Sequence, residues 1–262
     1  SHVRYGSLDD LLNAVKPALQ IEDGRLEGVS PEALRGEVID RLVFNAVFNE
    51  EKPLRALCRW AIREAAGRLG LWPSSIQGVY RIRGRGECDG VTGPAINLRG
   101  ITFDAARAGC RAAKTQETGA FIFEIARSEI GYTGQRPSEY ATVILAAGIK
   151  EGFQGPVFLQ GDHFQASSRA YRQNPESEVE NLRALIREAI AAGFFNIDID
   201  ASTLVELDKP SMEEQQRLNC RVTVSPMATR IQNQIRNGST APSMDGFPGG
   251  ANTPKEVVTS MV

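Results

Sequence analysis

From about Gly93 onward, short apolar runs alternate with amphipathic stretches. The apolar runs, which read as strands, cover residues 95–97, 119–125, 155–160 and 194–199. Between them, hydrophobic residues recur every three to four positions, as in amphipathic helices, over residues 103–113, 137–150 and 177–192. Short apolar strands that alternate with helices predict βαβ units and a parallel sheet covered on both faces. A flat doubly wound sheet and a closed barrel both have this alternation of strands and helices, so the pattern does not distinguish between the two folds.

The first third of the chain has a different pattern. Helical spacing of apolar residues predicts helices over 31–48 and 53–69, and Gly70 offers a stop for the second. Residues 81–86 follow as a basic loop broken by glycine, either a phosphate contact or a solvated connector. We therefore expect residues 1–88 to form a helical N-terminal extension that packs against the domain after it.

Beyond Asp200 the alternation weakens. Residues 221–225 are a candidate fifth strand, whereas 226–262 are rich in Gly, Pro, Asn, Ser and Thr without clear periodicity. That segment is too short for the three further βα units of an eight-stranded barrel. Missing segments, truncation or an unrelated tail would each give this pattern. We expect a β/α-barrel half over 89–225 and, over 226–262, an irregular tail or a remnant of the second half.

Polar residues stand at or just beyond the end of every predicted strand. They are Asn97, then Glu124, then Asp162 with His163, and finally Asp198, Asp200 and Ser202. Parallel α/β folds build their active sites at the carboxyl ends of their strands, so this set predicts a site. For Glu124, an ion pair with Arg127 explains the residue equally well.

Asp162 and His163 form the most specific pair in the sequence. An imidazole beside a carboxylate suits a metal ligand next to a general acid or base. The alternative is a histidine satisfied by a loop carbonyl, with its neighbour capping a helix. At the end of a core strand we favour the site. The chain holds only one other histidine, His2.

The fourth predicted strand carries three polar residues on one face. Period two puts Asn196, Asp198 and Asp200 on that face and Ile197 and Ile199 on the other. Burying unpaired charge is costly, so these side chains need partners or a metal. The alternative for Asp198 is an ion pair with a lysine or arginine inside the barrel.

Composition narrows the class of function. The net charge of −2 gives no general attraction to nucleic acid or to an anionic membrane. No apolar run approaches the roughly 20 residues that cross a bilayer. The four cysteines form no CxxC pair, which is typical of reduced thiols in a cytoplasmic protein. P-loop and dinucleotide-binding fingerprints are absent from the sequence.

Three segments together resemble the class II ketose-bisphosphate aldolases, which act on fructose or tagatose bisphosphate. Residues 94–134 are similar to the family's opening, where a strand ending in Asn leads through a helix to a second strand and a Tyr-x-Gly loop. FLQGDHFQ (158–165) and FFNIDIDASTL (194–204) are similar to its third and fourth strands. Their Gly-Asp-His and Asp-Ala-Ser motifs are also similar to those of the non-catalytic tagatose-bisphosphate aldolase subunit. The resemblance covers roughly residues 90–210.

The resemblance implies a TIM-type (β/α) barrel, incomplete in this chain, and a metal-dependent carbon–carbon lyase of glycolysis or related carbohydrate metabolism. It implies that Asp162 moves the proton of the substrate hydroxyl and that His163 is the first of three histidine ligands to a catalytic zinc. It further implies a sugar-phosphate substrate and a homo-oligomer, either dimer or tetramer. The substrate-binding residues would be Asn97, Glu124, Asp200 and Ser202.

One departure from the family pattern affects the metal. The family's other two zinc ligands are histidines on later strands, but no histidine follows His163. One histidine with carboxylates can instead hold a harder ion such as Mg²⁺ or Mn²⁺. Two hypotheses follow. The first is a class II aldolase-like lyase that cleaves a phosphorylated ketose with a divalent metal, zinc in the family. The second is a non-catalytic aldolase-like barrel that binds a sugar phosphate or supports a partner aldolase subunit.

Overall fold

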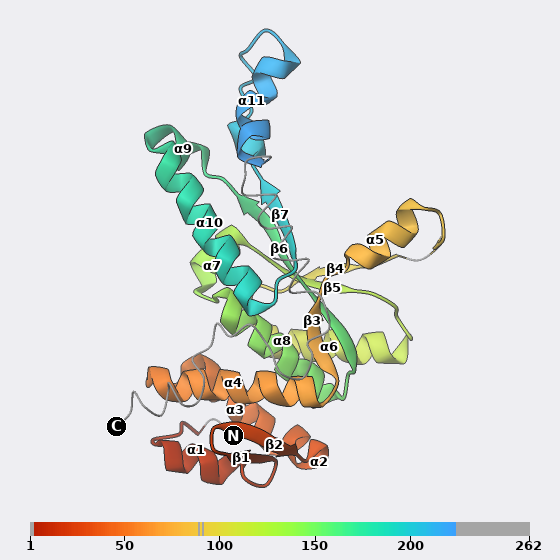
Figure 1. Cartoon of the computed structure of the whole chain (residues 1–262), viewed down its shortest axis with the longest axis vertical. Helices are drawn as coiled ribbons and strands as arrows, with labels where there is room; N and C mark the ends of the chain where they lie inside the picture. Colours follow the sequence, from red (N-terminus) through yellow and green to blue (C-terminus); the bar gives the residue numbers. More distant parts are fainter. Residues whose placement is uncertain (1–2, 89, 91, 224–262) are drawn as a thin grey trace.

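The computed structural model describes residues 3–88, 90 and 92–223, and its centre is a parallel sheet with helices packed against it (Figure 1). The predicted tail, residues 226–262, lies outside the described residues, as does the end of the candidate strand 221–225. The α/β fold class is confirmed, and the arrangement is that of a partial TIM-type barrel with N-terminal helices.

The predicted strands and helices between residues 92 and 200 are all present. The strands are β4 (Ala95–Asn97), β5 (Ile122–Ala126), β6 (Gly155–Gln165) and β7 (Asn196–Asp200). The predicted helices are α6 (Thr102–Thr115), α8 (Pro137–Glu151) and α10 (Pro175–Ala192). Two short helices that were not predicted lie between them, α7 (Arg127–Thr133) and α9 (Ser168–Gln173). All neighbouring strands pair in parallel, as predicted.

The N-terminal segment contains the two predicted helices, further helices and a β-hairpin that were not predicted. The helices of this segment are α1 (Leu8–Val15), α2 (Pro31–Ala33), η1 (Leu34–Val38), α3 (Ile39–Phe48), α4 (Lys52–Arg68) and α5 (Gln77–Gly84). An antiparallel hairpin, β1 (Leu19–Glu22) and β2 (Arg25–Val29), turns at Asp23-Gly24, where both residues have positive φ. An Asp-Gly turn of this kind suits the twist of a hairpin. The loop prediction for 81–86 is wrong in part, because Arg81–Gly84 belong to α5.

A strand from this segment joins the central sheet. β3 (Leu71–Ser74) pairs in parallel with the first residues of β6, Gly155–Phe158. β5 occupies the opposite edge of β6, and β7 pairs with residues 160–165. β3 and β7 therefore lie one after the other along the same edge of β6. A four-residue strand that contains a proline gives no periodicity to read from sequence.

The candidate strand at residues 221–225 is wrong where the structure describes it. Arg221–Thr223 are the last turn of α11 (Met212–Thr223), which follows the short helix η2 (Ser202–Leu204). Val222 is buried against a small apolar cluster that includes Leu204, and Leu218 packs there too. Leu218 and Val222 are four residues apart, the spacing of one helix face.

The two faces of the sheet differ in character. α6, α8 and α10 pack on one face, and α3 and α4 add a layer against α8 (Figure 1). That face buries the largest core residues of the strands, including Phe123, Leu159 and Phe164. Strand register puts Asn97, Glu124 and Gln160 on the other face. We call this second face, which carries these polar side chains, the polar face, and it corresponds to the interior face of a β/α-barrel.

Candidate functional site

A bulge in β6 creates the candidate site. The strand runs through Asp162 and His163 to Gln165 instead of ending at residue 160 as predicted. Its register with β7 shifts between Gly161 and Phe164, so that Asp162 and His163 together stand opposite Asp198. Two residues opposite one define a β-bulge. His163 has the left-handed φ of 41° within it.

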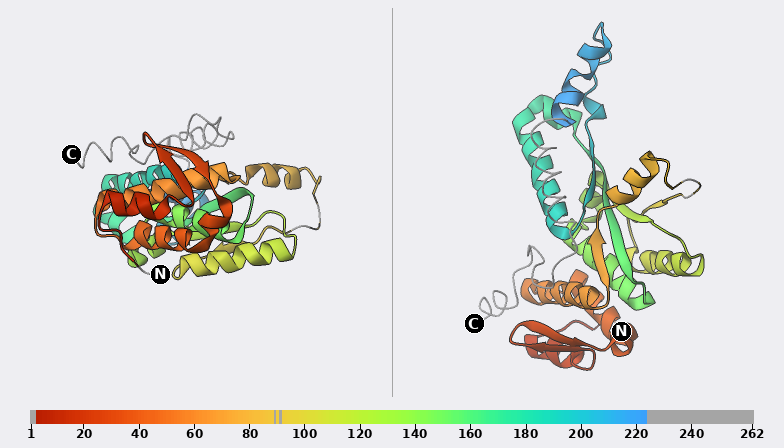
Figure 2. Two further views of the ribbon diagram at one scale, coloured as in Figure 1. Left: turned by 90° about the horizontal axis from the view of Figure 1, so that it is seen from below. Right: turned by 45° about the vertical axis from the view of Figure 1, so that its right-hand side comes forward.

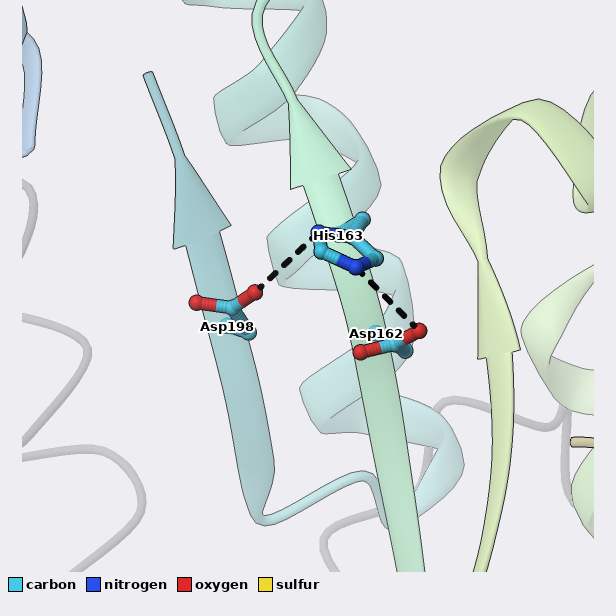
Figure 3. A group of neighbouring side chains, drawn as sticks. All are labelled: Asp162, His163 and Asp198. Carbon is cyan, nitrogen blue, oxygen red and sulfur yellow. Dashed lines mark ion pairs between the residues drawn. The ribbon is translucent and has the colours of Figure 1, made fainter. Parts of the chain in front are cut away.

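The bulge decides which face of the sheet the imidazole occupies. In a regular strand, consecutive side chains point to opposite faces, so His163 would face the helices. Because of the extra residue, Asp162 and His163 lie on the same side and face Asp198 (Figure 3). Phe164 then returns to the helix face, where it is fully buried. A bulge beside an active site commonly redirects one side chain in this way.

Gly161 makes this local geometry possible. A Cβ atom added there would lie 2.7 Å from the ring of Phe164. Any larger residue would push the ring out of the core or move the bulge. In the Gly-Asp-His-Phe sequence, the close contact with the Phe164 ring thus explains why the first residue is glycine. The two polar residues lie between this glycine and the phenylalanine.

The imidazole of His163 lies among three carboxylates. Its Nδ1 is 3.3 Å from Asp200 Oδ2 and 3.7 Å from Asp198 Oδ2, and its Nε2 is 3.9 Å from Asp162 Oδ2. Within the described part of the chain, His163 therefore contacts carboxylates and not a loop carbonyl, and Asp198 contacts the imidazole and not a lysine or arginine. The imidazole remains 63% exposed, so the site is open to solvent.

The carboxylates change the proton affinity of the imidazole. The charge of Asp162 is the largest cause that raises the pKa of His163, and the hydrogen bond to Asp200 and the charges of Asp198 and Asp200 add to it. Burial opposes this only in part. The imidazole therefore holds its proton to a higher pH than an isolated histidine does.

Asp200 is held in its ionised form by its neighbours. Burial acts to raise its pKa, but hydrogen bonds from Ser202, Gln165 and His163 outweigh it, and the pKa is lowered. The Ser202 backbone N–H donates to Oδ1 at 2.9 Å, and Gln165 Nε2 donates to Oδ2 at 2.6 Å. The predicted site residue Ser202 therefore contacts Asp200 directly.

Glu124 lies on the same face of the neighbouring strand. Gln160 Nε2 donates to its Oε2 at 3.0 Å. Burial, followed by the charges of Asp162 and Glu129, raises the pKa of Glu124. The alternative ion pair with Arg127 is wrong, because Arg127 instead donates to Glu178 at 2.6 Å and to a main-chain carbonyl of β6.

Asn97 is held by a carboxylate that the sequence reading did not single out. Asn97 lies opposite Glu124 in the register of β4 and β5, and its Nδ2 donates to Glu129 Oε2 at 2.9 Å. Glu129 is buried and also accepts from the Ala126 N–H and from Arg99. Its place three residues into the first turn of α7, after Ala126, is the sequence signal of a glutamate that caps its own helix.

Three of these residues form a possible metal site. Asp162, His163 and Asp198 each offer one ligand atom, and the three atoms lie within 4.8 Å of one another (Figure 3). One imidazole nitrogen with carboxylate oxygens is a donor set that suits a divalent cation. The three-histidine zinc site cannot form within the chain, which holds only His2 and His163. The residues thus fit a divalent ion but not the full zinc set of the family.

Fold and site together define a class of protein: a β/α-barrel type whose polar, titratable residues gather at the carboxyl ends of parallel strands. Residues 124–245 match the family model described as D-tagatose-1,6-bisphosphate aldolase subunit GatZ/KbaZ-like. The predicted resemblance is confirmed over this segment, which spans less than half of the chain. It contains Glu124 and the whole histidine–carboxylate cluster, whereas Asn97 precedes it. Comparison with curated proteins and with solved structures gives no match.

None of the helices among the described residues is long and apolar enough to cross a membrane.

Proposed function

We propose that the polar face of the sheet is an aldolase-type site that cleaves a phosphorylated ketose, of the fructose- or tagatose-bisphosphate type, with the help of a divalent metal. The observation that carries the proposal is the bulge that turns Asp162 and His163 toward Asp198 and Asp200. The family match supports the aldolase connection and a role in carbohydrate metabolism.

In this proposal His163 and Asp198 hold the divalent ion. Asp200, 3.3 Å from Nδ1, would help to hold the ring in place. When bound, the ion would polarise the carbonyl of the ketose phosphate and stabilise the negative charge that develops as the carbon–carbon bond breaks.

Asp162 is the proposed acid–base residue. Its carboxylate lies beside the imidazole, 3.9 Å from Nε2, so it can accept the proton of the substrate hydroxyl during cleavage. Glu124, Asn97 and Ser202 complete the proposed contacts to the substrate. The carboxylate oxygens of Glu124 can accept hydrogen bonds from sugar hydroxyls.

The test combines metal analysis of the purified protein with aldol-cleavage assays on fructose and tagatose bisphosphates, with and without chelator. We expect bound divalent metal and chelator-sensitive cleavage. Asp162→Ala should reduce cleavage by about 10²–10⁴-fold, the usual contribution of general acid–base catalysis. The matched control is Asp104→Asn, an exposed carboxylate on α6. A metal-free protein with no activity on either sugar phosphate would sink the proposal.

A second candidate is a non-catalytic barrel that binds a sugar phosphate or supports a partner aldolase subunit. Two observations support it: His163 is the single histidine at this site among the described residues, and its imidazole is 63% exposed. The description of the matching family also speaks of an aldolase subunit. Addition of the protein to a histidine-complete class II aldolase should then raise that enzyme's activity or stability, and Asp162→Ala should raise it equally well. Unaided turnover that Asp162→Ala abolishes would exclude this candidate.

We place the protein in the cytoplasm in either case. This proposal rests on the unpaired cysteine pattern of the sequence and on the metabolic family that matches it.

A further inference from the structure

A basic helix projects from the body of the molecule. α5 stands away from the sheet in both Figure 1 and Figure 2, and each of its residues is at least partly exposed. We call residues 77–86 the basic arm. It presents three exposed arginines, Arg81, Arg83 and Arg85, and the last of them lies 3.7 Å from Glu87. Two large apolar side chains of the arm are also exposed: Tyr80, just before Arg81, at 49%, and Ile82, between Arg81 and Arg83, at 41%.

A second projecting segment has the opposite charge. Residues 206–214 form the connection after η2 and the first turn of α11, at the far end of the molecule from the N-terminal helices (Figure 1). We call this segment the acidic arm. Its acidic residues are Glu206, Asp208, Glu213 and Glu214. Lys209 lies 4.0 Å from Glu206, and two large apolar side chains are again exposed, Leu207 at 80% and Met212 at 71%.

The two arms are complementary in charge and in apolar content. Four of the eight large apolar side chains exposed in the described part of the chain lie on them. Exposed apolar residues scattered singly need no explanation, whereas exposed apolar residues gathered on one segment and bordered by polar residues mark candidate interaction sites. The arms point in different directions in Figure 1 and Figure 2, so one copy does not bring its own arms together.

We propose that the basic arm of one copy binds the acidic arm of a second copy of this chain. The contact joins two different surfaces, so it is a heterologous, head-to-tail contact. Such contacts close into a ring when the rotation permits and otherwise extend as a filament. Arm-to-arm contacts are small, so the association is in the weak, transient class and depends on ionic strength. This inference is independent of the proposed aldolase site.

The first experiment is sedimentation of the full chain over a dilution series at about 50 mM and about 500 mM salt, where screening lengths differ severalfold. We expect concentration-dependent association at low salt, and a dissociation constant roughly tenfold higher at high salt, from the loss of several exposed ion pairs. A chain that stays monomeric at every concentration in low salt would overturn the proposal.

Charge reversal makes the test specific for the two arms. One variant carries Arg81→Glu and Arg83→Glu, and the other carries Glu213→Lys and Glu214→Lys. Each alone should be monomeric, because both arms then have the same sign. An equimolar mixture should associate again, because each variant supplies the arm that complements the other. No association on mixing, or association of a single variant as strong as the parent's, contradicts the proposal.

The control variant carries Glu27→Lys and Glu32→Lys, two exposed glutamates of the N-terminal segment. It changes net charge as much as the reversal on the acidic arm does, and it should associate as the parent does. A loss of association equal to that of the arm variants would show a general charge effect and would overturn the arm-specific proposal. So would a parent chain that stays monomeric but binds a histidine-complete aldolase through the basic arm.

Discussion

The two faces of the central sheet are made by the same strands but follow different rules. His163 and Phe164 are neighbours in sequence, yet the imidazole is 63% exposed whereas the phenyl ring is fully buried. On the helix face, residues such as Leu159 and Ile125 pack against helices and contribute mainly stability. On the polar face, carboxylates crowd one another and shift proton affinities. Substitutions should therefore separate into effects on folding and effects on the site.

The largest expected effect is on the helix face. Phe164→Ala removes a fully buried ring and should cost about 3–5 kcal/mol in the free energy of unfolding. His163→Asn, one residue away, should change that free energy by less than about 1 kcal/mol because the side chain is largely exposed. Denaturant unfolding of both variants checks the comparison. Equal losses would contradict the division between the faces.

Gly161→Ala should affect both faces at once. Its new methyl group would meet the Phe164 ring at 2.7 Å, so we expect a cost of about 1–3 kcal/mol together with weaker divalent-metal binding, because the bulge must shift. Gly119→Ala is the matched control, since a Cβ there meets nothing within 4 Å. Calorimetric metal titration and denaturant unfolding are the measurements. Unchanged metal binding in Gly161→Ala would contradict the dependence of the metal site on the bulge.

Glu129→Ala should affect both stability and the candidate site. The change leaves the Asn97 amide and the Ala126 N–H without their buried acceptor, at a cost of about 1–3 kcal/mol. If Asn97 contacts the substrate, KM should also rise. Glu129→Gln keeps one acceptor oxygen and should lose less of both. Identical behaviour of the two variants would argue against a hydrogen-bonding role.

The smallest expected effect is on pH dependence. The folded-state pKa of His163 is raised, so its contribution to stability is present below the unfolded pKa of about 6.5 and is lost as the pH rises through the folded pKa. The exposed setting keeps that contribution below about 1 kcal/mol. Metal affinity should change in the opposite sense and increase above the folded pKa, because the ligand must be deprotonated.

NMR titration of the His163 ring protons measures this pKa. Asp162→Asn should lower it, because the Asp162 charge is its largest cause. A His163 pKa that does not change in Asp162→Asn would contradict the close approach of the two side chains.

Much of the sheet could be predicted from the sequence, because buried parallel strands read as apolar runs. The runs at 119–125 and 155–160 lie within or beside β5 and β6. Shorter signals were missed: β3 has only four residues, one of them a proline, and the Asp23-Gly24 turn was not read as a hairpin. Residues 221–223 alternate like a strand, but their apolar contacts are made at helical spacing.

The sequence predicted which polar residues would gather at this edge of the sheet, but not their geometry. Polar residues at the ends of strands marked Asp162, His163 and Asp200, and the structure brings these three together. The bulge could not be predicted, because it depends on the register between β6 and β7, which alternation within one strand does not contain. Glu129 was missed because its contact with Asn97 joins residues that lie 32 positions apart in the sequence.

The shared edge of β6 has a practical consequence for shortened forms of this protein. A version that starts at residue 89 would lose β3 and uncover the main-chain hydrogen-bonding groups of Gly155–Phe158. It would also lose the Ile76 N–H that donates to Asn196 at the start of β7. Uncovered strand edges recruit other chains, so such a version is expected to aggregate. Expression trials should therefore keep residues 71–76 with the sheet.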